Sequence, residues 1–292
     1  MMRRKIGNAQ SNAKGLLYIC LVTLCGFSGW TAAQENIPSP TEALLHVIQG
    51  SESYHSPPQE VEIPKDKYGD DVRFGKKIFT QTPQYARRYT GNELACSHCH
   101  LDAGRRANAA PLWAAFGMYP MFRAQDDRTV SLEERIQQCF RLALNGIAPA
   151  RDTPEMRALV AYAHFLALGV PVGKNMPGRG FPQIVRTGQD PNPVRGNDIY
   201  EKHCVRCHGV EGEGVPRSKG GYDIPPLWGS NSFSAGSAFS TVDVLAGFVK
   251  ANMPPTQEWL LTDQEALDVA AYIVRRSRPW DPRKGLLRSL FE

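Results

Sequence analysis

The sequence has no apolar run long enough for an ordinary membrane span and no low-complexity tract. Its apolar stretch at residues 15–27 is shorter than the ~20 residues that a transmembrane helix needs. There are 34 Lys and Arg against 29 Asp and Glu, and four of the basic residues fall in residues 1–33, which hold no acid. The remaining 30 and 29 nearly cancel. With no array of basic and aromatic residues, nothing in the charge pattern indicates nucleic-acid binding.

The N-terminus has the three parts of an export signal. Basic residues come first, residues 15–27 form an apolar core, and residues 31–33 are small enough for a cleavage site. We therefore predict a signal peptide at residues 1–33 and a periplasmic mature protein that begins near Gln34 and has no stable membrane span. An uncleaved anchor is the alternative.

Cysteine is scarce, and its spacing is informative. Two of the seven cysteines lie in the predicted signal peptide, and four form CxxCH pentapeptides at residues 96–100 and 204–208. This pattern is typical of covalent haem attachment: two thiols bind the porphyrin edge and the following imidazole binds iron. A zinc site made of four cysteines is the alternative, but it leaves both histidines unexplained.

We therefore predict two covalently bound haem c groups. The predicted attachment residues and proximal iron ligands are Cys96, Cys99, His100, Cys204, Cys207 and His208.

The two pentapeptides belong to an internal repeat. Residues 73–79 resemble residues 195–200, and each segment precedes a pentapeptide. Pro111-Leu112-Trp113 follows the first pentapeptide, as Pro226-Leu227-Trp228 follows the second. A length of 292 residues suits about two domains. The repeat predicts an all-α protein with two cytochrome c-like domains in tandem.

Composition and repeat together predict the domain organisation. Residues 169–193 are rich in Gly and Pro without periodicity, which is typical of a linker. The predicted parts are a signal peptide (1–33), an N-terminal arm (34–70), a catalytic cytochrome c domain with haem 1 (71–168), the linker (169–193), and an electron-transfer cytochrome c domain with haem 2 and a C-terminal tail (194–292).

Three helices have clear start signals. Ser131 to Glu134 and Thr262 to Glu265 have the sequence of a capping box. Thr153-Pro154-Glu155 combines an N-cap, a proline in the first turn and an early acid. We expect a helix after each signal, and a further helix over residues 242–251.

The second haem has an evident candidate for its distal ligand. Met253 follows the helix expected at residues 242–251 and precedes two prolines, which would end the helix and hold the loop extended. Methionine ligation raises the haem potential and suits electron transfer. Met176 and Lys250 are rival ligands.

The first haem has Cys139 in the corresponding region, the one cysteine left after haem attachment. It shares a helix face with Leu132, Ile136, Phe140 and Ala143, so it should point at the core. The residues alone leave a haem ligand and a buried structural thiol equally open. The other possible ligands are Met118, Met121, Met156 and His164.

Arginines dominate the positive charge of the first haem domain. Arg135 lies four residues before Cys139, so both lie on one side of the expected helix. The planar guanidinium suits oxyanions, and most such arginines in the domain would be surface charges or haem-propionate partners. Arg135 and Arg123 are the ones we expect to touch a substrate.

Four stretches of the sequence resemble the di-haem thiosulfate dehydrogenases of the TsdA type. They are residues 96–105, 110–120, 132–140 and 177–181, and the resemblance covers about residues 70–280. It implies that His100 and Cys139 ligate the active-site haem and that His208 and Met253 ligate the second haem. The family arginine four residues before the cysteine matches Arg135.

The resemblance implies that two thiosulfate ions are oxidised to tetrathionate, with the reverse reaction at the same site. The expected catalytic residues are Cys139, Arg135 and Arg123. The electrons would leave through the His/Met haem to an external one-electron acceptor, such as another cytochrome or redox protein. A non-catalytic di-haem electron carrier and a SoxA-like subunit of a sulfur-oxidising complex are the alternatives.

Overall fold

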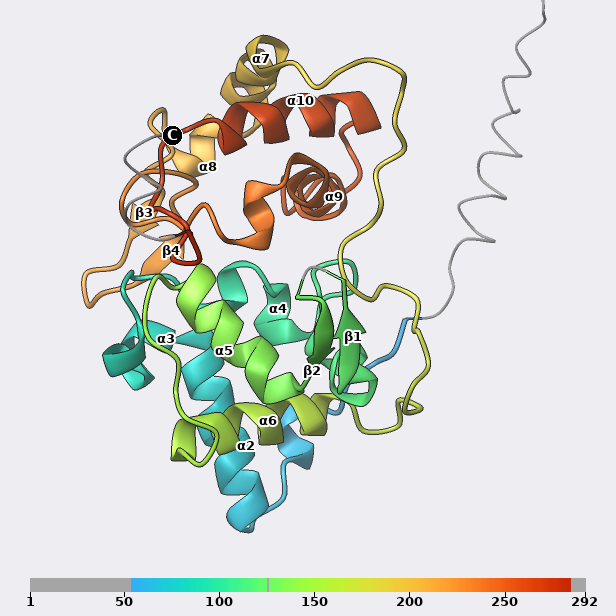
Figure 1. Cartoon of the computed structure of the whole chain (residues 1–292), viewed down its shortest axis with the longest axis vertical. Coiled ribbons are helices and arrows are strands. Elements are labelled where there is room, and N and C mark those ends of the chain that lie inside the picture. Colours follow the sequence, from blue (N-terminus) through green and yellow to red (C-terminus); the bar gives the residue numbers. More distant parts are fainter. Residues whose placement is uncertain (1–53, 125, 285–292) are drawn as a thin grey trace, which may run out of the picture. The chain divides into compact units, whose positions relative to one another are not determined.

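A computed structural model describes residues 54–124 and 126–284 of the chain (Figure 1). The predicted signal peptide, the first part of the predicted arm and the end of the tail lie outside the described residues. In the part that is described, no helix has the length and apolar character needed to cross a membrane.

The first haem domain is built mainly of helices. Its elements are α2 (Lys67–Thr80), α3 (Thr82–Tyr85), α4 (Leu101–Gly104), β1 (Met121–Arg123), β2 (Arg128–Val130), α5 (Leu132–Leu142) and α6 (Pro154–Leu166). Short 3₁₀ turns lie at Glu60–Glu62, Arg87–Tyr89, Cys96–His98, Leu112–Ala114 and Phe116–Met118. Helix α2 begins at Lys67, a few residues before the expected start of the domain.

The second haem domain repeats this plan. Its elements are α7 (Pro193–His203), α8 (Val205–His208), β3 (Val215–Pro216), β4 (Tyr222–Ile224), a 3₁₀ turn (Ala238–Ser240), α9 (Val242–Asn252) and α10 (Asp263–Val274). The predicted class, all-α with two cytochrome c-like domains in tandem, is confirmed. Two small antiparallel hairpins, β1–β2 and β3–β4, were not predicted, because strands of two or three residues are too short to show an alternating pattern.

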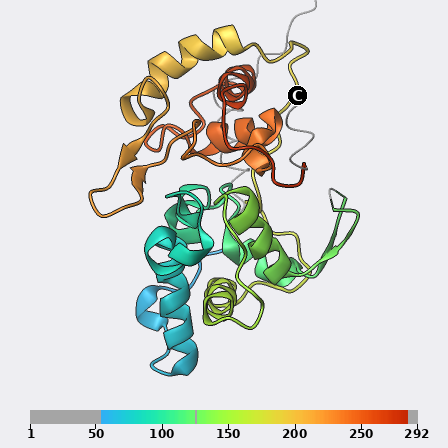
Figure 2. The ribbon, with the colours of Figure 1, turned by 60° about the vertical axis from the view of Figure 1, so that its left-hand side comes forward.

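In each domain the first and last helices cross at a glycine. A Cβ on Gly75 of α2 would lie 2.0 Å from the carbonyl oxygen of Ala158 on α6, and one on Gly196 of α7 would lie 2.0 Å from that of Asp268 on α10. Figure 2 shows both helix pairs side by side. Only glycine allows the backbones to approach so closely, which explains why both halves of the repeat carry it.

The predicted helix starts are confirmed. Ser131 and Thr262 accept hydrogen bonds from the backbone N–H of Glu134 and Glu265, whose side chains complete the capping boxes of α5 and α10. Thr153 caps α6 in the same way. These caps fix where α5 and α6 begin, and therefore which of their faces turn toward the haem site.

A buried carboxylate joins the linker end to α10. Asp268, only 2% exposed, accepts hydrogen bonds from Arg195 Nε at 2.6 Å, the Asn192 N–H at 2.7 Å and Gln264 Nε2 at 2.9 Å. Burial raises the pKa of this carboxyl, but the hydrogen bonds from Arg195, Asn192 and Gln264 outweigh burial and hold the pKa below its ordinary value.

We expect Asp268→Asn to destabilise the second domain by about 1–3 kcal/mol at pH 7, since it leaves a guanidinium without its partner. The folded pKa is lowered, so the stabilisation is complete above the unfolded pKa and disappears as the pH falls through the folded pKa. Thermal unfolding of the haem-loaded proteins should therefore show a difference in stability between the parent and Asp268→Asn that becomes smaller below about pH 4. The matched control is Asp243→Asn, whose ion pair with Arg186 is about half exposed. An equal loss in both variants would contradict the prediction.

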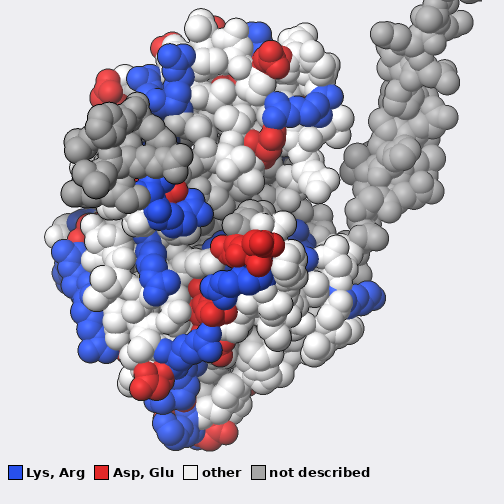
Figure 3. Space-filling model, viewed as in Figure 1, with Lys and Arg blue, Asp and Glu red and all other residues white. Residues whose placement is uncertain are grey.

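Charges of both signs are mixed on the face of the molecule that Figure 3 shows. On the face in Figure 3, Lys and Arg lie among Asp and Glu, without a continuous field of one sign. This mixture agrees with the near-neutral balance of the chain after residue 33.

Candidate active site

The first pentapeptide and helix α5 line one cavity of about 680 Å³. Cys96, Cys99 and His100 come from the pentapeptide, and Arg135 and Cys139 come from α5. Most of the remaining wall is apolar: Phe79, Leu94, Ala95, Ala110, Pro111, Leu112, Ala115, Leu132, Ile136, Phe140, Ala143, Leu144, Leu159 and Ala163. The structure thus brings together every residue that the sequence assigns to haem 1 except Arg123.

Both pentapeptide histidines are oriented by a backbone carbonyl. His100 Nδ1 donates to the Ala110 carbonyl at 2.7 Å, and His208 Nδ1 donates to the Pro225 carbonyl at 3.0 Å. Each carbonyl immediately precedes one of the repeated Pro-Leu-Trp triplets. Donation from Nδ1 leaves the lone pair of Nε2 available, which is how a metal-ligating histidine is usually held. The repeated triplets therefore orient the two histidines.

The thiol of Cys139 differs from those of the first pentapeptide. Burial by itself raises the pKa of Cys139. The nearby guanidinium of Arg135 and a hydrogen bond with His100 outweigh burial, and together with Arg123 they lower the pKa to about 7. For Cys96, by contrast, burial raises the pKa to about 12. Of the three thiols that line this cavity, Cys139 therefore forms a thiolate most readily.

The two predicted substrate arginines share a hydrogen-bond acceptor. Gln138 Oε1 accepts from Arg135 Nη1 at 3.3 Å and from Arg123 Nη1 at 3.4 Å. Arg123 is also paired with Asp126 at 3.1 Å, whereas Arg135 forms no ion pair with a carboxylate among the described residues. The charge of Cys139 is the main cause that raises the pKa of Arg135. Tyr119 and Asp126 act in the same direction, and together they outweigh burial and keep the guanidinium protonated. Arg135 is thus available to an anion, whereas Arg123 is not among the residues that line the cavity.

The predicted linker contributes to the same cavity. Arg179, Gly180 and Gln183 are among the residues that line it. Composition predicted only a linker for these residues, and no functional role was predicted for Tyr119 or Gln138. One signal was available for Arg179, Tyr119 and Gln138, because the runs at residues 177–181, 110–120 and 132–140 belong to the family resemblance.

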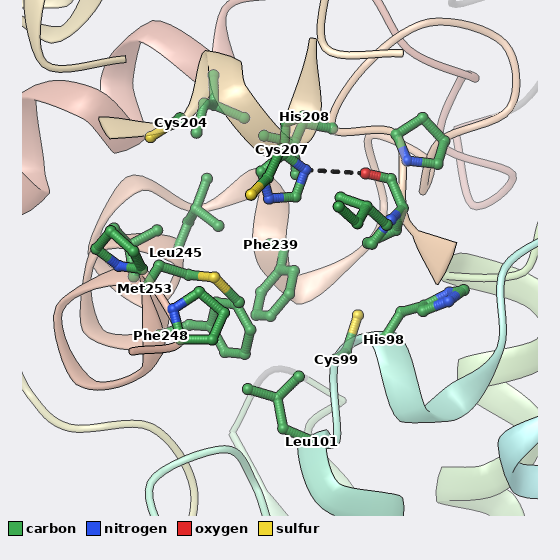
Figure 4. A pocket seen from close by; sticks show the side chains of 18 of the residues that line it. His98, Cys99, Leu101, Cys204, Cys207, His208, Phe239, Leu245, Phe248 and Met253 are labelled. Carbon is green, nitrogen blue, oxygen red and sulfur yellow. Dashed lines mark hydrogen bonds between the residues drawn. The ribbon is translucent and has the colours of Figure 1, made fainter. Parts of the chain in front are cut away.

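The second pentapeptide lines a separate cavity of about 380 Å³. Figure 4 shows Cys204, Cys207, His208 and Met253 around it, with Leu245, Phe239 and Phe248 as apolar walls. His208 and Met253 come from different elements and both face the cavity. The structure therefore gathers the four predicted haem 2 residues.

The rival ligands lie elsewhere or have other partners. Lys250 is ion-paired with Asp263, and Met176 lies outside both lining sets. The Tyr68 hydroxyl and His164 Nδ1 are hydrogen-bonded at 2.7 Å, and Met156 is fully buried in the core. Met118 and Met121 do not line the first cavity.

The two cavities share part of their walls. Leu94 and Cys99 line both, and Ser97, His98 and Leu101 of the first domain also line the second cavity (Figure 4). The second cavity is therefore completed by the first domain. Groups bound in the two cavities would be neighbours, which suits electron transfer between them.

The residues present fit two haem groups. Each cavity has the two thiols of one pentapeptide, a histidine that a backbone carbonyl orients through Nδ1, and largely apolar walls. The zinc alternative does not fit, because Cys96 lines only the first cavity and Cys204 only the second. Within the described ranges, no group of three or more His, Cys, Asp and Glu side chains could hold a metal ion.

Comparison with known proteins agrees with this arrangement. Residues 82–172 match the family described as SoxA/TsdA, cytochrome c domain, and residues 193–277 match the family described as cytochrome c. The chain is 40% identical to a thiosulfate dehydrogenase of Stutzerimonas stutzeri, over 90% of this chain and 87% of that protein. It is 39% identical to one of Thiomonas intermedia, over 91% of this chain and 85% of that protein.

A solved structure gives the same result for the fold. The chain resembles thiosulfate dehydrogenase (TsdBA) from Marichromatium purpuratum with a TM-score of 0.78 and 38% identity. The match covers 82% of this chain and 54% of that chain, so this protein spans about half of the longer one. Taken together, the cavities and the relatives show that the chain belongs to the thiosulfate dehydrogenase family and is a c-type cytochrome oxidoreductase with two covalently bound haem c groups.

Proposed function

We propose that this protein couples two thiosulfate ions into tetrathionate, releasing two electrons, and that it does so in the periplasm. The observation that carries the proposal is the pairing of Cys139 with an arginine that forms no ion pair with any described carboxylate, together with His100 in one cavity. Relatives named thiosulfate dehydrogenase support the choice of substrate, and the export signal at residues 1–33 supports the compartment.

The chain offers a different ligand pair in each cavity. We assign His100 and Cys139 to the first haem and His208 and Met253 to the second, with the pentapeptide cysteines forming the thioether links. Haem held by these residues would supply one-electron redox chemistry, so two such groups could store the two electrons of the reaction until an external one-electron acceptor takes them.

Positive charge is needed because the reaction joins two dianions. At a separation of about 4 Å, two such ions repel each other by about 4 kcal/mol even in water, and by more in a cavity. Arg135 lies at the wall and offers a planar fork for a sulfonate, and Arg123 adds charge nearby. These arginines would offset the repulsion and hold one thiosulfate with its outer sulfur near Cys139.

Cys139 is the group that can bond to this sulfur. Its lowered pKa makes a thiolate available at neutral pH, and the thiolate is a nucleophile. Joining the Cys139 thiolate to the outer sulfur of thiosulfate forms one S–S bond and releases two electrons. The outer sulfur of a second thiosulfate then attacks the bound one, which breaks the bond to Cys139, frees tetrathionate and regenerates the thiolate. Reversing these steps reduces tetrathionate.

Purified protein with thiosulfate and ferricyanide, and no other protein, tests the proposal. We expect one tetrathionate for every two thiosulfates consumed and two ferricyanides reduced. A SoxA-like subunit would need a carrier protein and would give no free tetrathionate. A pure electron carrier would reduce no ferricyanide from thiosulfate at a catalytic rate. Either result would overturn the proposal.

The assignment of Met253 predicts a measurable change in the second haem. Met253→Leu removes the thioether ligand, so the midpoint potential of that haem should fall by roughly 100 mV or more. A spectroelectrochemical titration of the purified protein measures the fall. Met176→Leu is the matched control, because Met176 lines neither cavity. The assignment fails if the Met253 variant keeps the parent potential.

A further inference from the structure

Arg179 is presented to the first cavity by a rigid segment of the linker. It lies between two glycines with left-handed backbone angles, Gly178 at φ +76° and Gly180 at φ +74°. The Gly178 carbonyl accepts from the Asn108 N–H at 2.7 Å, and the Gly180 carbonyl accepts from the Ala110 N–H at 2.7 Å. The two flanking peptide groups are thus pinned to the loop whose Ala110 carbonyl also orients His100.

Packing fixes this segment further. A Cβ on Gly178 would lie 2.8 Å from Cβ of Ala107 and 2.9 Å from the ring of Tyr54. On the other side of Arg179, the ring of Phe181 packs against Phe248 of the second domain with centroids 5.7 Å apart. A backbone held so closely loses little further freedom when the side chain that it carries binds a ligand.

The guanidinium of Arg179 has weak partners. Its Nη1 donates to Asn175 Oδ1 at 3.1 Å, and its Nη2 lies 3.5 Å from the sulfur of Met121. A thioether is a poor acceptor, and Arg179 forms no ion pair with any carboxylate in the described part of the chain. The positive charge is therefore uncompensated at the wall of a cavity, where an anion gains most from it.

A chain of neighbouring side chains connects Arg179 with Arg123 and Arg135. Met121 and Arg123 are two residues apart on β1, so their side chains point to the same face of the hairpin. Arg123 in turn shares the acceptor Gln138 with Arg135. This chain of side chains runs from the linker across β1 to α5, with Arg179 at one end and Arg135 at the other.

We propose that Arg179 is a second anion-binding residue of the active site and holds a sulfonate of the second thiosulfate. This inference rests on the proposed function, because the reaction needs two oxyanions side by side. With Arg135 on one sulfonate and Arg179 on the other, the pair also matches the two charged ends of tetrathionate. A haem propionate offers a similar oxyanion to a guanidinium, so the experiment must separate these two sources.

The test compares Arg179→Gln and Arg179→Lys with Arg186→Gln, an exposed arginine of the same linker. Haem content and thermal midpoint establish that each variant is folded. We expect Arg179→Gln to raise KM for thiosulfate about 10- to 100-fold, with a smaller change in kcat. The dissociation constant of tetrathionate for the oxidised protein, measured by calorimetry, should rise by a similar factor. Arg179→Lys should recover part of both losses, and Arg186→Gln should leave both unchanged.

The midpoint potential of the first haem separates substrate from propionate. A substrate role predicts that Arg179→Lys, which keeps the positive charge, has the midpoint potential of the parent. A shifted potential with an unchanged tetrathionate dissociation constant would assign Arg179 to the haem and overturn the proposal. The proposal would also be overturned if a folded Arg179 variant kept both the KM for thiosulfate and the tetrathionate dissociation constant of the parent. Failure of the proposed function is a separate result, because the parent protein would then form no tetrathionate.

Discussion

Cys139→Ala should reduce thiosulfate oxidation by roughly 1,000-fold or more while both haems stay attached. The attachment cysteines lie outside α5, so the substitution leaves covalent haem binding intact. What it removes is the thiolate that Arg135 and His100 favour at the wall of the first cavity. Steady-state assays with thiosulfate and ferricyanide measure the loss. The haem content, from the absorbance of the reduced protein, establishes that the variant is assembled.

A near-infrared spectrum tests whether Cys139, whose loss lowers the activity, is also a ligand of the first haem. The parent protein should show the near-infrared charge-transfer band of a thiolate-ligated ferric haem, and Cys139→Ala should lack it. Cys139→Met supplies a neutral sulfur instead, so the band should also disappear and the potential of the first haem should rise. Arg141→Gln is the matched control, because Arg141 is exposed on the same helix. Parent-level activity in either Cys139 variant would refute a role for this thiolate in the reaction.

The second large effect is expected for Arg135→Gln, which should lower kcat/KM on the order of 100- to 1,000-fold. Arg135 has two functions in the first cavity. It offers a planar fork to the substrate sulfonate, and it is the charge that most strongly stabilises the Cys139 thiolate. Glutamine keeps a similar length and polarity but has no charge, so both functions are lost together. Initial rates at several thiosulfate concentrations give kcat and KM separately.

Arg135→Lys separates charge from geometry. Lysine keeps the positive charge but cannot form the bidentate contact, so it should recover part of the activity. The matched control is Arg128→Gln, since Arg128 is half exposed and its ion pair with Glu134 lies away from the cavity lining. If Arg135→Gln and Arg128→Gln had the same small effect, Arg135 would have no special role in catalysis.

Local patterns were enough to predict the architecture. A CxxCH pentapeptide is determined by covalent chemistry, because thiols and imidazole must match one edge and one face of the porphyrin at short range. Capping boxes act within four residues, which is why the starts of α5 and α10 agree with the prediction. The repeated glycines, Gly75 and Gly196, also had to be alike, since each lets two helices cross at the same short distance.

Features that depend on contacts between residues far apart in the sequence could not be predicted from local patterns. Periodicity placed Cys139 on the buried face of its helix but left a ligand and a structural thiol equally open. Only the tertiary structure places α5 on the wall of the cavity that the first pentapeptide also lines, and so brings Cys139 and His100 into one site. Likewise, the composition of residues 169–193 predicted a linker but not its contacts. Glycine and proline indicate that a segment lacks periodic structure, and they do not show what the segment touches.

By itself, then, the sequence determined two haem attachment sites, a tandem all-α fold and the starts of its main helices, since these depend on covalent spacing and on contacts within a few residues. The tertiary structure decided the composition of the cavities. It brought Arg179 from the linker to the wall that holds Arg135, and it made Cys99 common to both cavities. The reason is physical: backbone hydrogen bonds such as that between Asn108 and Gly178 join residues 70 positions apart, and no local pattern encodes such a contact.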